Sequence, residues 1–207
     1  PRGSTPREPP RLNYINNMKT GIELQEGRKA ERKELKVDLR PVTERVKTFE
    51  DAVAELGEAH PLCIHFREMY DNFLFEGGDA VSDIVAYLKL RIITAALNEG
   101  WTPKFVKGEY RYSLYFVFYG EEEWDDLPAD TKRKRGVLLS GCEQHGACVC
   151  CGCETSFRFA SHEQASGSHH LCFKDRELAL YAGKQFASLW LDFCYLPNTE
   201  CKPYFNE

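Results

Sequence analysis

The sequence lacks an apolar run long enough to cross a membrane. Its longest apolar stretch, VSDIVAYLKLRIITAAL at 81–97, is interrupted by Asp83, Lys89 and Arg91, and it is shorter than the about 20 apolar residues that a spanning helix needs. The N-terminal residues are polar and rich in proline and arginine, which is unlike a secretory signal. These absences predict a soluble, cytoplasmic protein without a membrane partner.

An excess of one charge sign is missing too. The chain has 27 basic and 32 acidic residues and a formal net charge of −5, whereas a domain that binds nucleic acid over most of its surface is usually strongly basic. A local patch beside an aromatic strand is the remaining candidate for binding, and a solvated loop is the alternative for its charges. The candidate binding residues are Lys132, Arg133, Lys134, Arg135, Tyr115 and Tyr119.

The common catalytic signatures are absent as well. The sequence contains no Walker A loop, no G-x-G-x-x-G after a strand, no H-E-x-x-H and no G-x-S-x-G. Nothing therefore indicates a phosphate-binding loop, a zinc protease or a serine hydrolase. No small-molecule substrate is indicated, and an enzyme is the less favoured class of protein.

Cysteine and histidine, by contrast, are concentrated in one stretch. Six of the nine cysteines and four of the six histidines lie between 142 and 172, and CVCCGC at 148–153 contains two overlapping C-x-x-C pairs. A zinc site needs four such ligands, but overlapping pairs do not define which cysteines would act together. Zinc binding, thiol chemistry and plain loop or strand cysteines all stay open, the last being favoured. The candidate metal ligands are Cys148, Cys151, Cys153, His169 and Cys172.

Helical periodicity recurs in four segments. Thr48 and Gly57 have the residue types that begin and end a helix, and Asp175 suits the start of the last one. The third segment is apolar around most of its circumference, as is typical of a central, mostly buried helix. The predicted helices span 48–57, 61–75, 79–100 and 175–193.

Strand-like alternation is clearest in YRYSLYFVFYG at 110–120, which is aromatic, β-branched and partly apolar on both faces. Shorter strands are expected in VLLS, TSFRFAS and HLCF, and a long polar connection is expected at 120–136. The fold class that follows is α+β, with N-terminal helices and then a small, mainly antiparallel sheet closed by a C-terminal amphipathic helix.

Three regions are expected along the chain. Residues 1–40 form a flexible or charged N-terminal extension, 41–196 a single α+β domain and 197–207 an irregular tail. The opening PRGS resembles the remnant of an expression tag, although translated sequence upstream of Met18 is an equal alternative. Residues 1–17 are therefore left out of the functional prediction.

Three segments together resemble a known but uncharacterised family encoded by phages and prophages of gut anaerobes. They are ALNEGWTPKF at 96–105, the aromatic strand, and SGSHHLCFKDRELALYAGKQFASLWLDF at 166–193. The closing block of that family reads like GSRLCFKSRELAEYAGKQF, so His169 and His170 stand where the pattern has arginine. The resemblance covers about half of the chain and implies a phage or mobile-element context, with no assigned activity.

Two functions compete at this point. The favoured one is a non-enzymatic accessory or binding protein in the cytoplasm of a bacterial host or associated with a virion. It would present a variable Gly/Ser/Cys/His-rich segment at about 120–170 to an unknown protein or nucleic acid. The alternative is a small zinc-binding protein, structural or catalytic, or a thiol-dependent protein, centred on 142–172 and able to bind nucleic acid. No cofactor is predicted beyond this zinc.

Overall fold

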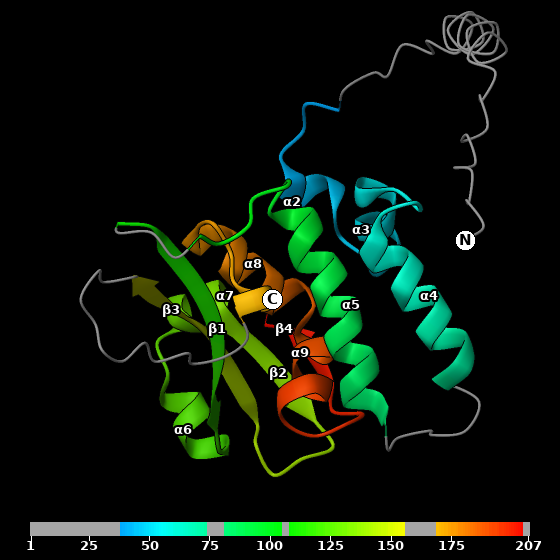
Figure 1. The fold of residues 1–207 in the computed structure, drawn as a ribbon. Coiled ribbons are helices and arrows are strands. Elements are labelled where there is room, and N and C mark those ends of the chain that lie inside the picture. The colour runs from blue at the N-terminus through cyan, green and yellow to red at the C-terminus, as the bar shows by residue number, and fades with distance from the viewer. Residues whose placement is uncertain (1–37, 74–80, 105–107, 156–168, 205–207) are drawn as a thin grey trace, which may run out of the picture. The chain divides into compact units, whose positions relative to one another are not determined.

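The structure, a computed structural model, describes residues 38–73, 81–104, 108–155 and 169–204 (Figure 1). The chain divides into two units, Pro1–Leu39 and Arg40–Glu207. Every helix and strand described below belongs to the second unit. Almost all of the predicted N-terminal extension lies outside the described residues.

In the described part of the chain four helices precede the sheet: α2 (Val42–Arg45), α3 (Phe49–Leu56), α4 (Pro61–Phe73) and α5 (Ser82–Leu97). The predicted start of α3 is confirmed, because the Thr48 hydroxyl accepts a hydrogen bond from the Asp51 N–H at 3.1 Å while the Asp51 carboxylate accepts one from the Thr48 N–H at 2.9 Å. This reciprocal pair satisfies two N–H groups that a helix start leaves without partners. Gly57 ends the helix with a φ of 86°, a backbone angle that glycine tolerates best.

The third predicted helix is confirmed as α5, the central helix of the domain. Leu90, Ile92, Ile93 and Leu97 are fully buried in it. Figure 1 shows α5 between α4 on one side and α9 (Ala187–Cys194) on the other, and both helices contact it. Its expected N-cap, Asp79, lies outside the described residues.

The sheet contains four antiparallel strands in the order β1-β3-β2-β4. They are β1 (Tyr110–Tyr119), β2 (Gly136–Ser140), β3 (Gly146–Thr155) and β4 (Glu200–Pro203). Helices followed by an antiparallel sheet confirm the α+β class. The prediction of an irregular tail at 197–207 is partly wrong, because β4 lies within it. This strand pairs with β2, with Cys201 opposite Leu139. No helix of the described residues is long and apolar enough to span a membrane.

The prediction of a long polar connection at 120–136 is also wrong. Two short helices, α6 (Glu121–Asp126) and α7 (Ala129–Arg135), occupy it. Trp124 of α6 is 2% exposed, and a Cβ atom added to Gly146 would lie 2.5 Å from its ring. The glycine therefore makes room for the indole, which anchors the two charged helices to the sheet.

The expected helix at 175–193 is two helices, α8 (Arg176–Gln185) and α9, separated by Phe186 with φ −113° and ψ 30°. Its predicted N-cap is confirmed, since Asp175 accepts a hydrogen bond from the Leu178 N–H at 2.8 Å. The strand expected in HLCF is instead a 3₁₀-helix, η2 (His169–Leu171), followed by a single bridge between Phe173 and Tyr112. Of TSFRFAS, only Thr155 lies within the described residues, as the last residue of β3.

Candidate functional site

The four cysteines of CVCCGC belong to β3, the strand between β1 and β2, whereas Cys142 lies in the connection before it and Cys172 follows η2. Successive side chains of a strand point to opposite faces, so Cys148 and Cys150 share one face and Cys151 and Cys153 the other. Each C-x-x-C pair is thereby divided between the two faces of the sheet. Among the described residues no group of three or more His, Cys, Asp or Glu could hold a metal ion. The zinc prediction finds no support in this geometry.

Two of these thiols also lie in surroundings that disfavour the thiolate. Burial raises the pKa of Cys148, and the neighbouring Cys150 adds to the rise. Burial raises the pKa of Cys151 to about 11. Because the thiolate is the form that attacks substrates and binds metals, both cysteines are poorly suited to either task.

The four basic residues predicted to bind a partner lie in α7, in different environments. Lys132 is buried, with its Nζ donating a hydrogen bond to the Asp125 carbonyl oxygen at 3.0 Å. Arg133 and Lys134 both pair with the Asp130 carboxylate, at 3.4 and 2.7 Å. Arg135 has no carboxylate partner in the described part of the chain. One carboxylate thus stands against four basic side chains, so α7 keeps a net charge of +3, although the buried Lys132 presents little of it at the surface.

The two predicted tyrosines lie on β1. Tyr115 is 53% exposed and stands opposite Cys150. Tyr119 is half-buried near Trp124, and its pKa is raised by burial and by the nearby Cys148. They share the sheet face that carries Cys148 and Cys150.

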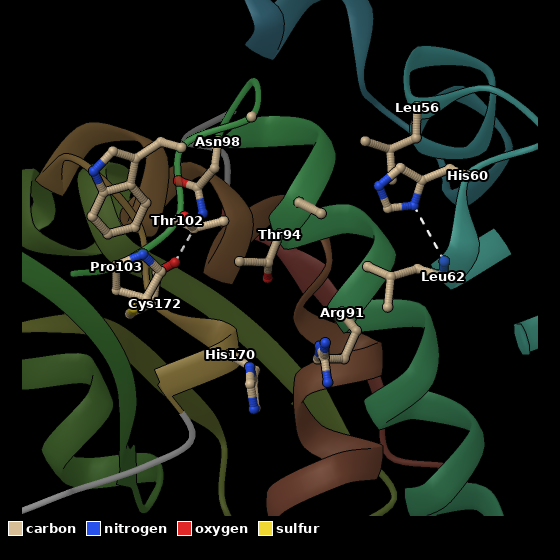
Figure 2. A pocket seen from close by; sticks show the side chains of 13 residues that line it. Leu56, His60, Leu62, Arg91, Thr94, Asn98, Thr102, Pro103, His170 and Cys172 are labelled. Atoms are coloured by element: carbon tan, nitrogen blue, oxygen red, sulfur yellow. Dashed lines mark hydrogen bonds between the residues drawn. The ribbon is translucent and has the colours of Figure 1, made fainter.

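A cavity of about 510 Å³ lies instead beside α5 (Figure 2), and we call it the α5 pocket. Its central wall is a stripe of α5 formed by Arg91, Thr94, Ala95 and Asn98, residues spaced so that they share one helix face. The other walls come from three segments: the α3–α4 connection, the turn after α5, and the end of η2. They supply Leu56, His60, Leu62, Gly100, Trp101, Thr102, Pro103, His170 and Cys172.

Asn98 fixes the far end of this pocket. Its side chain is 3% exposed, donates a hydrogen bond to the Cys172 carbonyl oxygen at 2.9 Å and accepts one from the Lys174 N–H at 3.0 Å. One buried amide thus joins the end of α5 to a segment more than seventy residues later in the chain. Cys172, predicted as a metal ligand, is placed in the pocket wall by this contact.

An ion-pair network holds the same end of α5. The Glu99 carboxylate pairs with Lys174 at 2.8 Å and with Arg45 at 2.6 Å, and Arg45 also pairs with Glu55 of α3. Lys174 is the main cause of a lowered pKa at Glu99, with Arg45 contributing. The chain then turns through Glu99 and Gly100, with φ angles of 49° and 83°, and so brings Trp101 into the pocket wall.

Thr94 is the unusual residue of the pocket. The residue is 2% exposed, and its Oγ1 finds no hydrogen-bond partner in the part of the chain that the structure describes. A threonine within a helix commonly donates its hydroxyl to a carbonyl one turn earlier, a bond that is not made here. In Figure 2 the hydroxyl points toward the side of the pocket where Arg91 and His170 lie.

Two further polar side chains line the pocket in defined orientations. Arg91 lies over the Tyr87 ring, with its Cζ 6.0 Å from the ring centroid, and its Nη1 is 3.5 Å from the Tyr87 hydroxyl. The His60 Nδ1 accepts a hydrogen bond from the Leu62 N–H at 3.2 Å. A neutral imidazole that accepts through Nδ1 carries its proton on Nε2, so His60 remains able to donate one.

The three segments that carry the family resemblance meet at this place. Asn98 and Trp101 come from ALNEGW, Cys172 and Phe173 come from the closing block, and Phe173 bridges to Tyr112 of the aromatic strand. Sequence reasoning did not select Arg91, Thr94 or His60. A threonine within the apolar run IITAAL of the helix was the available signal, and only the packed structure shows that its hydroxyl has no partner among the described residues.

Comparison of the chain with family models, curated proteins and solved structures gives no match. The resemblance to the phage and prophage family therefore stays a prediction.

Proposed function

We propose that the protein is a non-enzymatic binding protein that holds a small molecule in the α5 pocket. The observation that carries this proposal is the Thr94 hydroxyl, which is buried in the wall of a cavity of about 510 Å³ and has no hydrogen-bond partner among the described residues. A buried hydroxyl without a partner costs about 1–3 kcal/mol. Its oxygen has less than 1 Å² of accessible surface, so a turn of the Thr94 side chain toward the cavity is the step that lets a ligand atom form a hydrogen bond with it and recover that cost.

The size and walls of the pocket support binding. Ligand sites commonly measure about 300–1,000 Å³ and combine apolar walls with a few polar groups. Here Leu56, Leu62, Ala95 and Pro103 supply apolar wall, and Arg91 and Thr94 supply polar groups on adjacent turns of one helix.

Catalysis is less well supported by the same residues. None of the described residues that line the pocket is an aspartate or a glutamate, the side chains that most often accompany histidine in acid–base chemistry. A thiol-dependent activity, the alternative considered from the sequence, would have to use Cys172 here, and that side chain is 2% exposed.

In this proposal the binding site is the α5 pocket, not the segment at about 120–170 that was expected from the sequence. Much of the segment at about 120–170 forms α6, α7, β2 and β3, so it contributes to the frame of the domain. The phage context and a macromolecular partner, protein or nucleic acid, stay predictions that the pocket neither requires nor opposes.

A plugged pocket tests the proposal. Ala95→Trp places an indole into the cavity, and Ala54→Trp, at an exposed position of α3 outside it, is the matched control. Ligand-observed NMR with a mixed library of neutral, cationic and anionic fragments should give compounds that bind the native protein and Ala54→Trp but not Ala95→Trp. A folded Ala95→Trp protein that binds every compound as the native protein does would refute the proposal.

A further inference from the structure

We infer that the ligand of the α5 pocket is an organic anion, a small carboxylate with an apolar body, bound with its carboxylate between Arg91 and Thr94. This inference rests on the proposed function and adds the chemical class of the ligand.

The charge of the pocket wall is the first argument. Arg91 brings a permanent positive charge, and the described residues that line the pocket include no acidic side chain. No carboxylate among the described residues pairs with Arg91, whose Nη1 lies 3.5 Å from the Tyr87 hydroxyl. Other arginines of the domain, including Arg45, Arg67 and Arg133, do have carboxylate partners. A half-buried guanidinium without a counter-charge favours an anion as its partner.

The position of the two donors is the second argument. Arg91 and Thr94 are three residues apart on α5, which places their Cβ atoms about 5–6 Å from one another. The contact with Tyr87 holds the guanidinium in place, and its planar fork presents several N–H groups with geometry that matches a carboxylate. A carboxylate paired with Arg91 can accept a hydrogen bond from the Thr94 hydroxyl once the side chain turns its oxygen, which has less than 1 Å² of accessible surface, toward the cavity. One group can thus supply the hydrogen-bond partner of Thr94 and the counter-charge of Arg91 that the described residues do not supply.

The rest of the wall decides between an organic and an inorganic anion. Beside the polar His60, Asn98, Thr102 and His170, the wall contains the apolar side chains of Leu56, Leu62, Ala95, Trp101 and Pro103, and these apolar side chains gain nothing from a hydrated phosphate ion. Burial of an apolar body stabilises a complex by about 25 cal/mol for each Å² of apolar surface removed from water. The indole of Trp101 offers such a body a flat, apolar surface to pack against.

A matched pair of probes tests the inference. 2-Naphthoate and the neutral 2-naphthamide share one apolar body and differ in charge, and isothermal titration calorimetry measures the affinity of each. Charge-assisted hydrogen bonds of this kind correspond to an about 10- to 100-fold gain in affinity. The native protein should therefore bind naphthoate about 10- to 100-fold more tightly than naphthamide. Inorganic phosphate should bind more weakly than naphthoate.

Variants assign the effect to Arg91. Arg91→Gln should remove most of the preference for naphthoate, because it weakens naphthoate binding far more than naphthamide binding, and Arg91→Lys should keep part of the preference because it keeps the charge. Arg67→Gln, which removes a charge beside a different cavity lined by Glu50 and Glu58, is the control and should bind both probes as the native protein does.

Four outcomes overturn the inference: equal binding of both probes, no binding of naphthoate at millimolar concentration, phosphate binding as tight as naphthoate binding, or loss of naphthoate binding in Arg67→Gln. Equal binding of both probes that Ala95→Trp abolishes would leave the proposed function standing. Failure of every fragment to respond to Ala95→Trp would refute that function itself.

Discussion

Thr94 has a hydroxyl group that is buried without a partner, and this has a measurable consequence for stability. Thr199 is a matched case, because it is 5% exposed while its hydroxyl donates a hydrogen bond to the Leu196 carbonyl oxygen at 3.0 Å. Valine has nearly the shape of threonine, so each substitution to valine mainly removes the hydroxyl group. At Thr199 this also removes a hydrogen bond, and at Thr94 it removes none among the described residues.

We expect Thr94→Val to raise the free energy of unfolding by about 1 kcal/mol, because it replaces an unsatisfied hydroxyl with a methyl group. Thr199→Val should lower that free energy by about 1 kcal/mol, because it removes a formed bond. Urea denaturation of both variants measures the two changes. A Thr94→Val protein less stable than the native one would show that the hydroxyl has a structural partner, contrary to our account.

Individual residues also explain why the site was not predicted. The spacing of Arg91, Thr94, Ala95 and Asn98 along one helix face is visible in the sequence, but the predicted helix was interpreted only as a buried core element. Asn98 acts on Cys172 and Lys174, more than seventy residues away, and no local pattern predicts such a contact. His60 belongs to a short connection whose position depends on how α3 and α4 pack.

At the scale of elements, the segments with strong apolar periodicity were predicted correctly, as α3, α4, α5 and β1 show. The errors arise where side chains are small or charged. In β3, glycine, alanine and cysteine replace the large apolar residues that usually identify a strand. At Gly146 the reason is the room that Trp124 needs. In α6 and α7, charged residues conceal helices that Trp124 anchors.

The contact between α8 and the sheet gives a prediction at this scale. A Cβ atom on Gly183 would lie 3.1 Å from both Leu114 methyl groups and closer still to Val149. Gly183→Ala should therefore lower the free energy of unfolding by about 1–3 kcal/mol through overpacking, although alanine favours helices over glycine by about 1 kcal/mol.

The double variant Gly183→Ala/Val149→Ala separates packing from helix propensity. Removing the Val149 methyl groups makes room for the new one, so the two changes should be non-additive, with a smaller combined loss than their sum. Chemical denaturation of the two single variants and the double variant measures this coupling. Strict additivity would mean that α8 does not pack on β3 as described.

The ion-pair network at the end of α5 predicts a pH dependence. The pKa of Glu99 is lowered in the folded protein from its ordinary value of 4.5, chiefly by Lys174. A lowered pKa means that the contribution of Glu99 to stability is present above the unfolded value and is lost as pH falls through the folded value. Because Glu99 is 42% exposed, the contribution should be below about 1 kcal/mol.

The comparison with Glu99→Gln isolates this effect. The native protein should be more stable than the variant at neutral pH, and the difference should shrink as the pH falls below about 4.5. Asp51 and Asp130 also have lowered pKa values, but they are common to both proteins and cancel. A difference that stays constant down to low pH would contradict the network.

At the scale of the whole molecule, the cysteines are distributed through the fold rather than gathered at a centre. Cys63, Cys148 and Cys172 are buried and Cys153 is exposed. We therefore expect protein purified without chelator to contain no stoichiometric zinc, and a native thiol titration to modify Cys153 well before those three. About one zinc per chain with four protected thiols would restore the metal interpretation of the sequence.

The central claim is that the domain holds an organic anion in the α5 pocket, and a two-dimensional ¹H–¹⁵N spectrum recorded during a titration with 2-naphthoate tests it most directly. Aromatic ring currents shift the resonances of nearby nuclei, so the account predicts saturable shifts at the backbone amides of Thr94, Ala95, Asn98 and Gly100 and at the Trp101 indole N–H. Shifts confined to α3 and α4 around Phe66, or to the sheet face around Tyr115, would contradict it.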